Sequence, residues 1–489
     1  MKVKKISVFI SLALFGFVVN GQVRQPHSLY FMETIPQISQ MNPAFQPRAN
    51  GYVILPANYN LDVRSGFAVK DIFQQQGNKW YTPLEKQYNY DKFYKSIGKK
   101  AATFNSEGDW DIIGFGFRTS DNGYFSFGIS EHQFGNLALP RDLFKITENG
   151  FPSGTVLDFS PLHTRSMSYL QFNIGYSSKI NDRLTIGVKV KPLFGQLVVT
   201  SKIDKFKLHT GEQLWDIDAK GSIYSSLPIE EVITDAEGKI KEINFRDLDD
   251  YKVKDLIREY GTAFNNPGIA LDLGAAYQIN ERLIVSASLN NLGFISWTKD
   301  LNGIDFNGKY AFNGVYYDAS TDNDDLFKNL GDSIADAMNY VVQHDKFKTM
   351  LSPIFYAGAS YDLSKSMSIG LLSRSVFWQN GVSQSFNASF NLQPYSFIAL
   401  NAGATWQIKG NVYLGGGMMF HLRPLPLQVY ILSDFIPLNY STVKIDNEKE
   451  FSVFERQKSA TIRVGINLIF GRHGYTNKPM LDRGKSSWN

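Results

Sequence analysis

The 489-residue chain contains no cysteine. Disulfide bonds and thiolate metal sites are therefore excluded, so its stability has to come from the fold itself. After the N-terminus the chain also lacks any apolar run that approaches the roughly 20 residues of a membrane-spanning helix. No linker rich in proline, glycine or serine interrupts it, and its composition does not change between the two halves. These absences indicate one continuous architecture without disulfides and without spanning helices.

Sequence patterns of catalytic and metal sites are also missing. The chain has no GxSxG elbow and no HExxH pattern, and its seven histidines show no close ligand spacing. Residues 303–309, GIDFNGK, match a phosphate loop, but Tyr310 stands where that loop requires Ser or Thr. Residues 322–325, DNDD, lack the EF-hand glycine and are interpreted as a solvated helix start. We expect no enzyme, no metal and no cofactor; a hydrolase assembled from separate strands is the alternative.

The N-terminus has the pattern of a secretory signal peptide. Three lysines precede the apolar residues 6–19, and the small residue Gly21 follows. A membrane anchor is the alternative, but the apolar run is shorter than the roughly 20 residues of a span. We expect cleavage after Gly21, so that residues 1–21 are removed and the formal charge falls from +4 to 4 − 3 = +1. Such a charge gives no reason to expect nucleic acid as a partner.

Apolar and polar residues alternate along many segments of the remaining chain. In residues 170–177, LQFNIGYS, every second side chain is apolar and the others are polar or small, which is the periodicity of a β-strand. Two such segments carry a cation in mid-strand on the polar face, Lys189 and Arg463. A soluble sandwich alternates too, but these segments run for about ten residues, which a tilted strand needs to cross a bilayer. The predicted strands are residues 51–63, 108–118, 123–131, 165–178, 184–200, 268–279, 283–295, 353–363, 367–378, 382–392, 397–408, 412–421, 427–435 and 459–470.

The connections between these segments differ in length on the two sides. The turns on the side of the termini are all short, whereas most connections on the other side are long, for example 201–267 and 296–352. Outer-membrane barrels have short periplasmic turns and long extracellular loops. We therefore predict an all-β fold: a transmembrane antiparallel β-barrel of about 14 strands over residues 51–470, in the outer membrane of a Gram-negative bacterium.

A ring of this size is too wide for its own side chains to fill, so we expect something else in the lumen. Residues 39–47, SQMNPAFQP, precede the first strand, and Pro43 and Pro47 keep this stretch out of helices and sheets. We predict that residues 22–50 fold inward as a hatch; a loose periplasmic leader is the alternative. Glycines on polar strand faces would leave room for the hatch: Gly114, Gly116, Gly187, Gly274, Gly403, Gly415, Gly417 and Gly465.

Three features carry a resemblance to a known family: Asn-Pro-Ala at residues 42–44, hairpins such as residues 277–294, and the predicted strand count. With them the chain resembles the FadL family of outer-membrane long-chain fatty acid transporters, and more closely their PorV-type relatives from the type IX secretion lineage. The resemblance implies a luminal plug on the path of small hydrophobic molecules, which diffuse through the barrel wall. The residues of this plug and ligand path would be Asn42, Pro43, Ala44 and Phe45. Helices in the loops and a periplasmic tail, residues 471–489, depart from the family pattern.

Two connections are predicted to contain helices. In the connection 296–352, apolar residues recur at helical spacing, so we expect an amphipathic lid helix that packs on neighbouring loops; docking of another protein is the alternative. Its apolar stripe includes Leu326, Leu330, Ile334 and Met338. Residues 245–261 are predicted to form a second, weaker helix that ends at a glycine. Residues 203–220 are predicted to form a hairpin that projects beyond the membrane.

Two functions fit these expectations. The first is a passive outer-membrane channel for small hydrophobic compounds, which need no energy coupling to leave water for an apolar path. The second, which the PorV-type resemblance implies, is a non-transporting barrel that acts as a scaffold or shuttle subunit of a surface or secretion complex. The expected partners are outer-membrane lipid, a hydrophobic small molecule and, for the scaffold, other surface or secretion proteins.

Overall fold

The fold was analysed in a computed structural model of the chain. The structure describes residues 26–68, 71, 74–77, 79–81, 88–119, 122–227, 229–234, 240–245, 265–313, 341–378, 381–408, 412–422, 424–436, 440–446, 449–454 and 458–472. Several predicted elements lie outside these ranges. They are the signal peptide, the four lid-helix residues, nearly all of the predicted helix 245–261 and the tail beyond residue 472.

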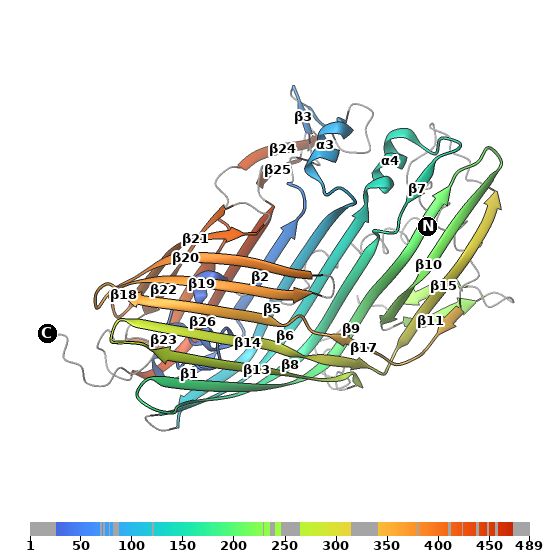
Figure 1. The fold of residues 1–489 in the computed structure, drawn as a ribbon. Coiled ribbons are helices and arrows are strands. Elements are labelled where there is room, and N and C mark those ends of the chain that lie inside the picture. The colour runs from blue at the N-terminus through green and yellow to red at the C-terminus, as the bar shows by residue number, and fades with distance from the viewer. Residues whose placement is uncertain are drawn as a thin grey trace.

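Antiparallel strands form one closed ring (Figure 1). The last ring strand pairs with the first, and a kink at residues 55–57 divides the first strand into β1 and β2, which both pair with β5 and β26. When β1 and β2 are counted as one strand, the ring has 14 strands, as predicted. The ring strands are β1 (Ala49–Ile54), β2 (Asn58–Ser65), β5 (Ala101–Arg118), β6 (Gly123–Pro140), β8 (His163–Lys179), β9 (Leu184–His209), β13 (Pro267–Gln278), β14 (Leu283–Trp297), β18 (Ile354–Asp362), β19 (Met367–Trp378), β20 (Gly381–Tyr395), β21 (Ile398–Gln407), β22 (Val412–Leu422), β23 (Leu427–Ser433) and β26 (Ser459–Arg472).

Shorter elements accompany the ring. The additional strands are β3 (Gln74–Gln76), β4 (Lys79–Tyr81), β7 (Val156–Asp158), β10 (Leu214–Ser226), β11 (Ile229–Thr234), β12 (Ile240–Phe245), β15 (Leu301–Asn313), β16 (Val341–Gln343), β17 (Phe347–Met350), β24 (Tyr440–Asp446) and β25 (Lys449–Phe454). The helical elements are η1 (His27–Leu29), η2 (Pro36–Gln40), α3 (Tyr90–Ser96) and α4 (Arg141–Asn149). Among the described residues, no helix combines the length and the apolar composition needed to cross a membrane.

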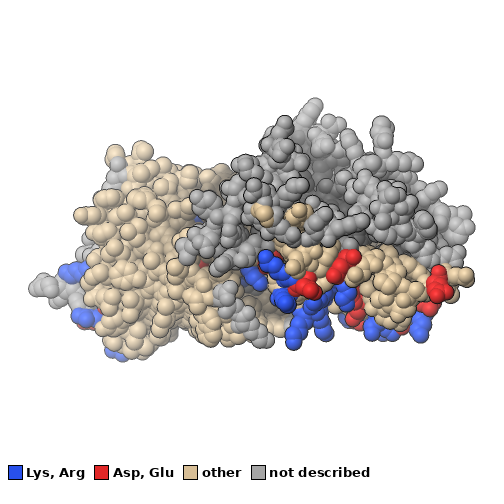
Figure 2. Space-filling model, turned by 90° about the horizontal axis from the view of Figure 1, so that it is seen from above, with Lys and Arg blue, Asp and Glu red and all other residues tan. Residues whose placement is uncertain are grey.

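Side chains alternate between the outer surface and the lumen along the ring strands. Ile174, Tyr176 and Ile186 are 44%, 45% and 44% exposed on the outside, whereas the cations Lys189 and Arg463 are 5% and 2% exposed. On the face shown in Figure 2, the left part of the surface is almost without charged side chains except at its edge, and Lys, Arg, Asp and Glu residues gather toward the lower right. The apolar outer face confirms the predicted orientation. It suits contact with acyl chains, and a closed ring leaves no unpaired strand edge in the bilayer.

Tight turns join the ring strands on one side, for example the turn closed by the backbone hydrogen bond from Ile180 N–H to the Leu184 carbonyl (2.8 Å). On the other side several strands continue past their predicted ends. β5 begins at Ala101 instead of 108, β6 ends at Pro140 instead of 131, and β9 ends at His209 instead of 200. The prediction stopped where the apolar alternation weakens, but ladder hydrogen bonds pair polar segments as well as apolar ones.

β9, β10 and β15 continue beyond the ring as a sheet, at the right of Figure 1. The pairing of β10 with β9 confirms the predicted hairpin of residues 203–220. One face of this sheet is apolar and buries Leu208, Trp215 and Phe306. The phosphate-loop match at residues 303–309 lies within β15, where it is extended and paired with β10. It therefore has no loop that could surround a phosphate.

Candidate functional site

The N-terminal segment of residues 26–48, called the luminal segment below, lies inside the ring (Figure 1). It contains the 3-10 turns η1 and η2, closed by short-range bonds such as Met41 N–H to the Ile38 carbonyl (3.0 Å). Pro36 begins η2, where its fixed φ suits a helix start. Such turns offer no strand edge, so the segment cannot extend the ring. Its hydrogen-bond partners come instead from strands all around it: β2, β5, β9, β14, β20, β23 and β26.

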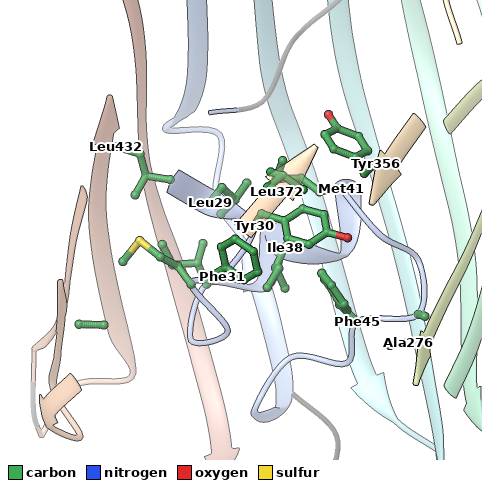
Figure 3. Close-up of a cluster of buried hydrophobic side chains, with 14 of the residues drawn as sticks. Leu29, Tyr30, Phe31, Ile38, Met41, Phe45, Ala276, Tyr356, Leu372 and Leu432 are labelled. Carbon is green, nitrogen blue, oxygen red and sulfur yellow. The ribbon is translucent and has the colours of Figure 1, made fainter. Parts of the chain in front are cut away.

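A buried apolar core joins the luminal segment to the barrel wall (Figure 3). The Tyr30 ring makes edge-to-face contacts with Phe31 and Phe45, with centroids 5.1 Å apart in each pair, and lies 5.8 Å from Tyr356 of β18. Each edge-to-face pair contributes about 0.5–1.5 kcal/mol beyond the burial of its area. Burial raises the pKa of Tyr30 to about 12, against the opposing effect of a 3.0 Å hydrogen bond with Ser286. The hydroxyl therefore stays protonated at neutral pH.

Glycines in the wall leave the space that these aromatic rings occupy. A Cβ on Gly358 of β18 would lie 2.5 Å from the Tyr30 ring, and one on Gly370 of β19 would lie 2.5 Å from the Phe31 ring. Real Cβ atoms do not approach other atoms so closely. Any other residue at either position would push the rings out of the core.

The predicted site residues Asn42 and Pro43 lie against a similar glycine window. Gly187 of β9 and Gly274 of β13 are paired directly opposite one another in the wall. A Cβ on Gly187 would lie 2.2 Å from the Pro43 carbonyl carbon, and one on Gly274 would lie 2.1 Å from Asn42 Oδ1. The backbone of the luminal segment therefore lies in direct contact with the wall at this point.

Asn42 supplies the hydrogen bonds that Pro43 cannot make. Its side-chain amide donates to the carbonyls of Ala275 (3.3 Å) and Ala287 (3.2 Å), and its Oδ1 accepts from Ala44 N–H (2.9 Å). Phe45 N–H donates to the Asn42 carbonyl (3.0 Å) and so turns the Phe45 ring into the apolar core. One asparagine thus both forms a local turn and links two wall strands, β13 and β14.

A charged network lies beside η2. The Arg463 guanidinium donates to Asp111 (3.0 Å), to the Gln40 side-chain oxygen (3.0 Å) and to the Tyr430 hydroxyl (3.2 Å). Gln40 in turn donates to Asp111 (3.1 Å). A buried ion pair is stable only when its remaining hydrogen-bonding groups are also satisfied. Gln40 of the luminal segment supplies one acceptor to Arg463 and one donor to Asp111, so the segment and the barrel wall stabilise one another here.

The first residues of the luminal segment are held by a Ser-His-Asp chain. The His27 ring lies 2.5 Å from Asp434 through Nδ1 and 2.9 Å from the Ser385 hydroxyl through Nε2, and the backbone N–H groups of His27 and Ser28 also donate to Asp434. This order matches a hydrolytic triad. Ser385 is buried, however, and a movement of the luminal segment that exposed it would also remove its base. The geometry fits an anchor better than a nucleophile.

A small polar cavity of about 50 Å³ lies between the luminal segment and the wall strands. Two lysines of β9 line it. Lys189 Nζ donates to the Ser39 carbonyl of the luminal segment (2.6 Å), and Lys191 pairs with Asp272 (2.5 Å). The cavity has room for a few heavy atoms only.

Aromatic side chains meet across the lumen on strands that are far apart in the ring. The rings of Phe134 from β6 and Trp378 from β19 stack with centroids 5.8 Å apart and planes inclined by 30°. The Arg165 guanidinium lies over Phe134, 5.5 Å from its centroid. This contact is called the cross-lumen stack below. Like the luminal segment, it narrows the lumen.

The structure brings the four predicted hatch residues together inside the ring, whereas Leu326, Leu330, Ile334 and Met338 lie outside the described residues. Sequence reasoning missed His27, Gln40 and Asp434. These residues carry no local pattern, because their partners lie far away in the sequence, 407 positions for His27 and Asp434. Polar residues at lumen-facing positions in the middle of strands were a usable signal. This signal identified Lys189 and Arg463.

Comparisons with known proteins give a family and a set of similar folds. The fold is similar to the toluene transporter TodX of Pseudomonas putida, with 10% identity, 88% of this chain and 93% of that chain covered, and a TM-score of 0.42. It is also similar to a FadL homologue of Pseudomonas aeruginosa (10% identity, 93% and 100% covered, TM-score 0.44) and to the toluene transporter TbuX of Ralstonia pickettii (9% identity, 93% and 100% covered, TM-score 0.44). These likenesses concern the fold alone.

No curated protein matches the chain in sequence. A family profile, in contrast, matches residues 43–434, which begin at Pro43 of the luminal segment and end at Asp434, the partner of His27. The match covers most of the chain and thus most of the ring. The chain therefore belongs to the family described as "Family of unknown function (DUF5723)".

Proposed function

We propose that the protein is an outer-membrane channel for small hydrophobic compounds, with residues 26–48 as a plug that closes its lumen. The observation that carries this proposal is the apolar core between Tyr30, Phe31 and the wall. Lumen-facing side chains of an outer-membrane barrel are generally polar. Here Leu372, Val376 and their neighbours give one side of the lumen an apolar surface, which the plug covers.

An apolar solute can take the place of the plug side chains on this surface. Transfer of its apolar area out of water is favourable by about 25 cal/mol per Å². The solute and the plug would therefore compete for the same wall residues. Passage needs no nucleotide, because the free-energy gradient of the solute itself drives it. Asn42 to Phe45 would hold the lower part of the plug in place while Tyr30 and Phe31 move.

The rate of probe uptake by cells tests the channel. We expect cells that carry the protein in the outer membrane to take up the hydrophobic dye 1-N-phenylnaphthylamine faster than cells without it. Replacing Tyr30 and Phe31 together by alanine should raise the rate further, because the cover over the wall is lost. The matched control is Phe355→Ala, which removes an aromatic ring from the lipid-facing surface and should leave uptake unchanged. Uptake equal to that of cells without the protein would refute the channel.

The scaffold function stays a second candidate because of the sheet beyond the ring. β9, β10 and β15 extend past the apolar belt, and the outer face of this sheet carries charges such as the Lys205–Asp218 ion pair. A large polar surface outside the membrane suits binding of other surface proteins. Purification in mild detergent separates the two proposals. A lone barrel with a bound apolar ligand supports the channel, and a stable complex with other proteins supports the scaffold.

A further inference from the structure

The polar cavity beside the luminal segment has one apolar side and one side rich in hydrogen-bonding groups. Tyr169, Ile354 and Tyr356 supply its apolar part. Tyr356 also belongs to the apolar core around Tyr30, so the cavity adjoins the path on which the proposed solute would travel. A purely apolar solute would leave the polar side without partners, whereas an amphipathic solute could contact both sides.

The charges around the cavity balance. Its lining contains Lys189 and Lys191, Asp109 and Asp272, and the His132 ring; with His132 neutral the formal charge is 2 − 2 = 0. Lys191 pairs with Asp272, and the Asp109 carboxylate pairs with the His132 ring. Beside the cavity, Asp111 is paired with Arg463. A ligand with a net charge would disturb this balance in a buried site, which is costly.

Two lining residues show which hydrogen bonds a ligand could make. Asn290 is 4% exposed, and its side-chain oxygen accepts no hydrogen bond from any residue that the structure describes. Lys189 donates to the Ser39 carbonyl and, more weakly, to the Ser39 hydroxyl (3.3 Å). The lining therefore includes one residue whose buried acceptor lacks a donor and one lysine whose amino group can donate a further hydrogen bond. A hydroxyl group can satisfy both, because it donates one hydrogen bond and accepts others.

We propose that this cavity binds the neutral, hydroxyl-bearing head of an amphipathic solute, an inference that rests on the proposed channel function and specifies its substrate class. A carboxylate can only accept hydrogen bonds and an ammonium can only donate them, so neither matches both Asn290 and Lys189. The volume of about 50 Å³ admits a hydroxyl and the first carbon atoms of a chain. A hydroxyl that accepts from Lys189 also competes with the Ser39 carbonyl. A solute bound in the cavity would therefore weaken the hydrogen bond between Lys189 and the luminal segment.

Binding of six-carbon probes tests the assignment. The full-length protein is reconstituted in lipid nanodiscs, and 1-hexanol, hexanoate and hexylammonium are titrated calorimetrically at neutral pH, with empty nanodiscs subtracted. We expect 1-hexanol to bind at least about tenfold more tightly than either charged probe, which corresponds to about 1.4 kcal/mol. Equal or tighter binding of hexanoate, or no binding of 1-hexanol above the empty nanodiscs, would overturn the proposal.

A matched pair of serine variants locates the site. Ser130→Met fills the cavity from β6, and we expect it to weaken 1-hexanol binding at least about tenfold. Ser389→Met places the same side chain on a buried position of β20 that does not line the cavity, so binding should be unchanged. If Ser130→Met fails to fold, Asn173→Leu on β8 provides a second variant of the same lining. Unchanged binding in a folded cavity variant would contradict the assignment.

The two proposals can fail separately. If 1-hexanol binds as expected but the cells show no faster dye uptake, the cavity assignment stands and the channel does not. If uptake is fast but Ser130→Met leaves 1-hexanol binding unchanged, the channel stands and the cavity assignment fails.

Discussion

A single hydrogen atom in place of a side chain decides how closely the luminal segment can approach the wall. We predict that Gly274→Ala displaces Asn42 and Pro43, because the new Cβ would lie 2.1 Å from Asn42 Oδ1. Overpacking of this kind costs about 1–3 kcal/mol. The measurement is limited proteolysis of the folded barrel, in which the luminal segment of the variant should be cleaved about tenfold faster than that of the wild type.

The control is another lumen-facing glycine. A Cβ on Gly128 of β6 would find its nearest neighbour at 3.6 Å, which is an ordinary contact, so Gly128→Ala should be cleaved at the wild-type rate. Equal cleavage of the Gly274 and Gly128 variants would show that the window does not position the segment.

At the scale of elements, the sheet beyond the ring has a core of its own. We predict that Trp215→Ala loosens β10 without opening the barrel, because Trp215 is 6% exposed and packs with Phe151, Ile217 and their neighbours on the apolar face. Loss of a buried tryptophan side chain costs about 3–5 kcal/mol. We expect faster protease cleavage in the β9–β10 hairpin. The heat resistance of the ring, measured by gel electrophoresis, should be unchanged.

The adjacent residue serves as the control for this prediction. Leu214 is 54% exposed, so Leu214→Ala should change neither cleavage nor heat resistance. If Trp215→Ala lowered the heat resistance of the ring itself, the sheet and the barrel would have to be one cooperative unit.

The ring strands could be predicted from the sequence because the membrane imposes a local pattern. Every strand that crosses the bilayer presents alternate apolar side chains to lipid, so a period of two residues marks it regardless of its partners. The extensions of β5, β6 and β9 were missed since no such constraint acts beyond the apolar belt. Their residues pair through the backbone, and the side chains there can be polar.

The candidate site was predictable only in part. The prolines at 43 and 47 excluded strand and helix, and the segment around Asn42 does lie inside the ring. Its partners were not visible, because Asp434, Ser385 and Arg463 reach the segment only after the ring has closed. Nothing in the sequence near these residues distinguishes them from other polar residues on lumen-facing positions.

At the scale of the whole molecule, two features fill the lumen: the luminal segment and the cross-lumen stack, whose Trp378 packs against the apolar core of the segment. A ring of 14 strands is wider than one that its own side chains can fill. The luminal segment contributes apolar volume and also hydrogen bonds to buried charges, as Gln40 does for Arg463 and Asp111. The wall and the segment therefore form one core. Without the segment, the wall would enclose water.

Removal of the segment should therefore convert the barrel into an aqueous pore. We predict that a chain lacking residues 26–45 conducts ions in planar lipid bilayers, because water then hydrates Lys189, Asp111 and Arg463, while the wild type stays closed. Trp378→Ala in the deletion variant should raise the conductance further, since it removes the cross-lumen stack with Phe134. In the full-length chain the same substitution should leave the conductance at the wild-type level, because the luminal segment still fills the ring. A folded deletion variant that conducts no better than the wild type would mean that the stack, and not the segment, sets the barrier.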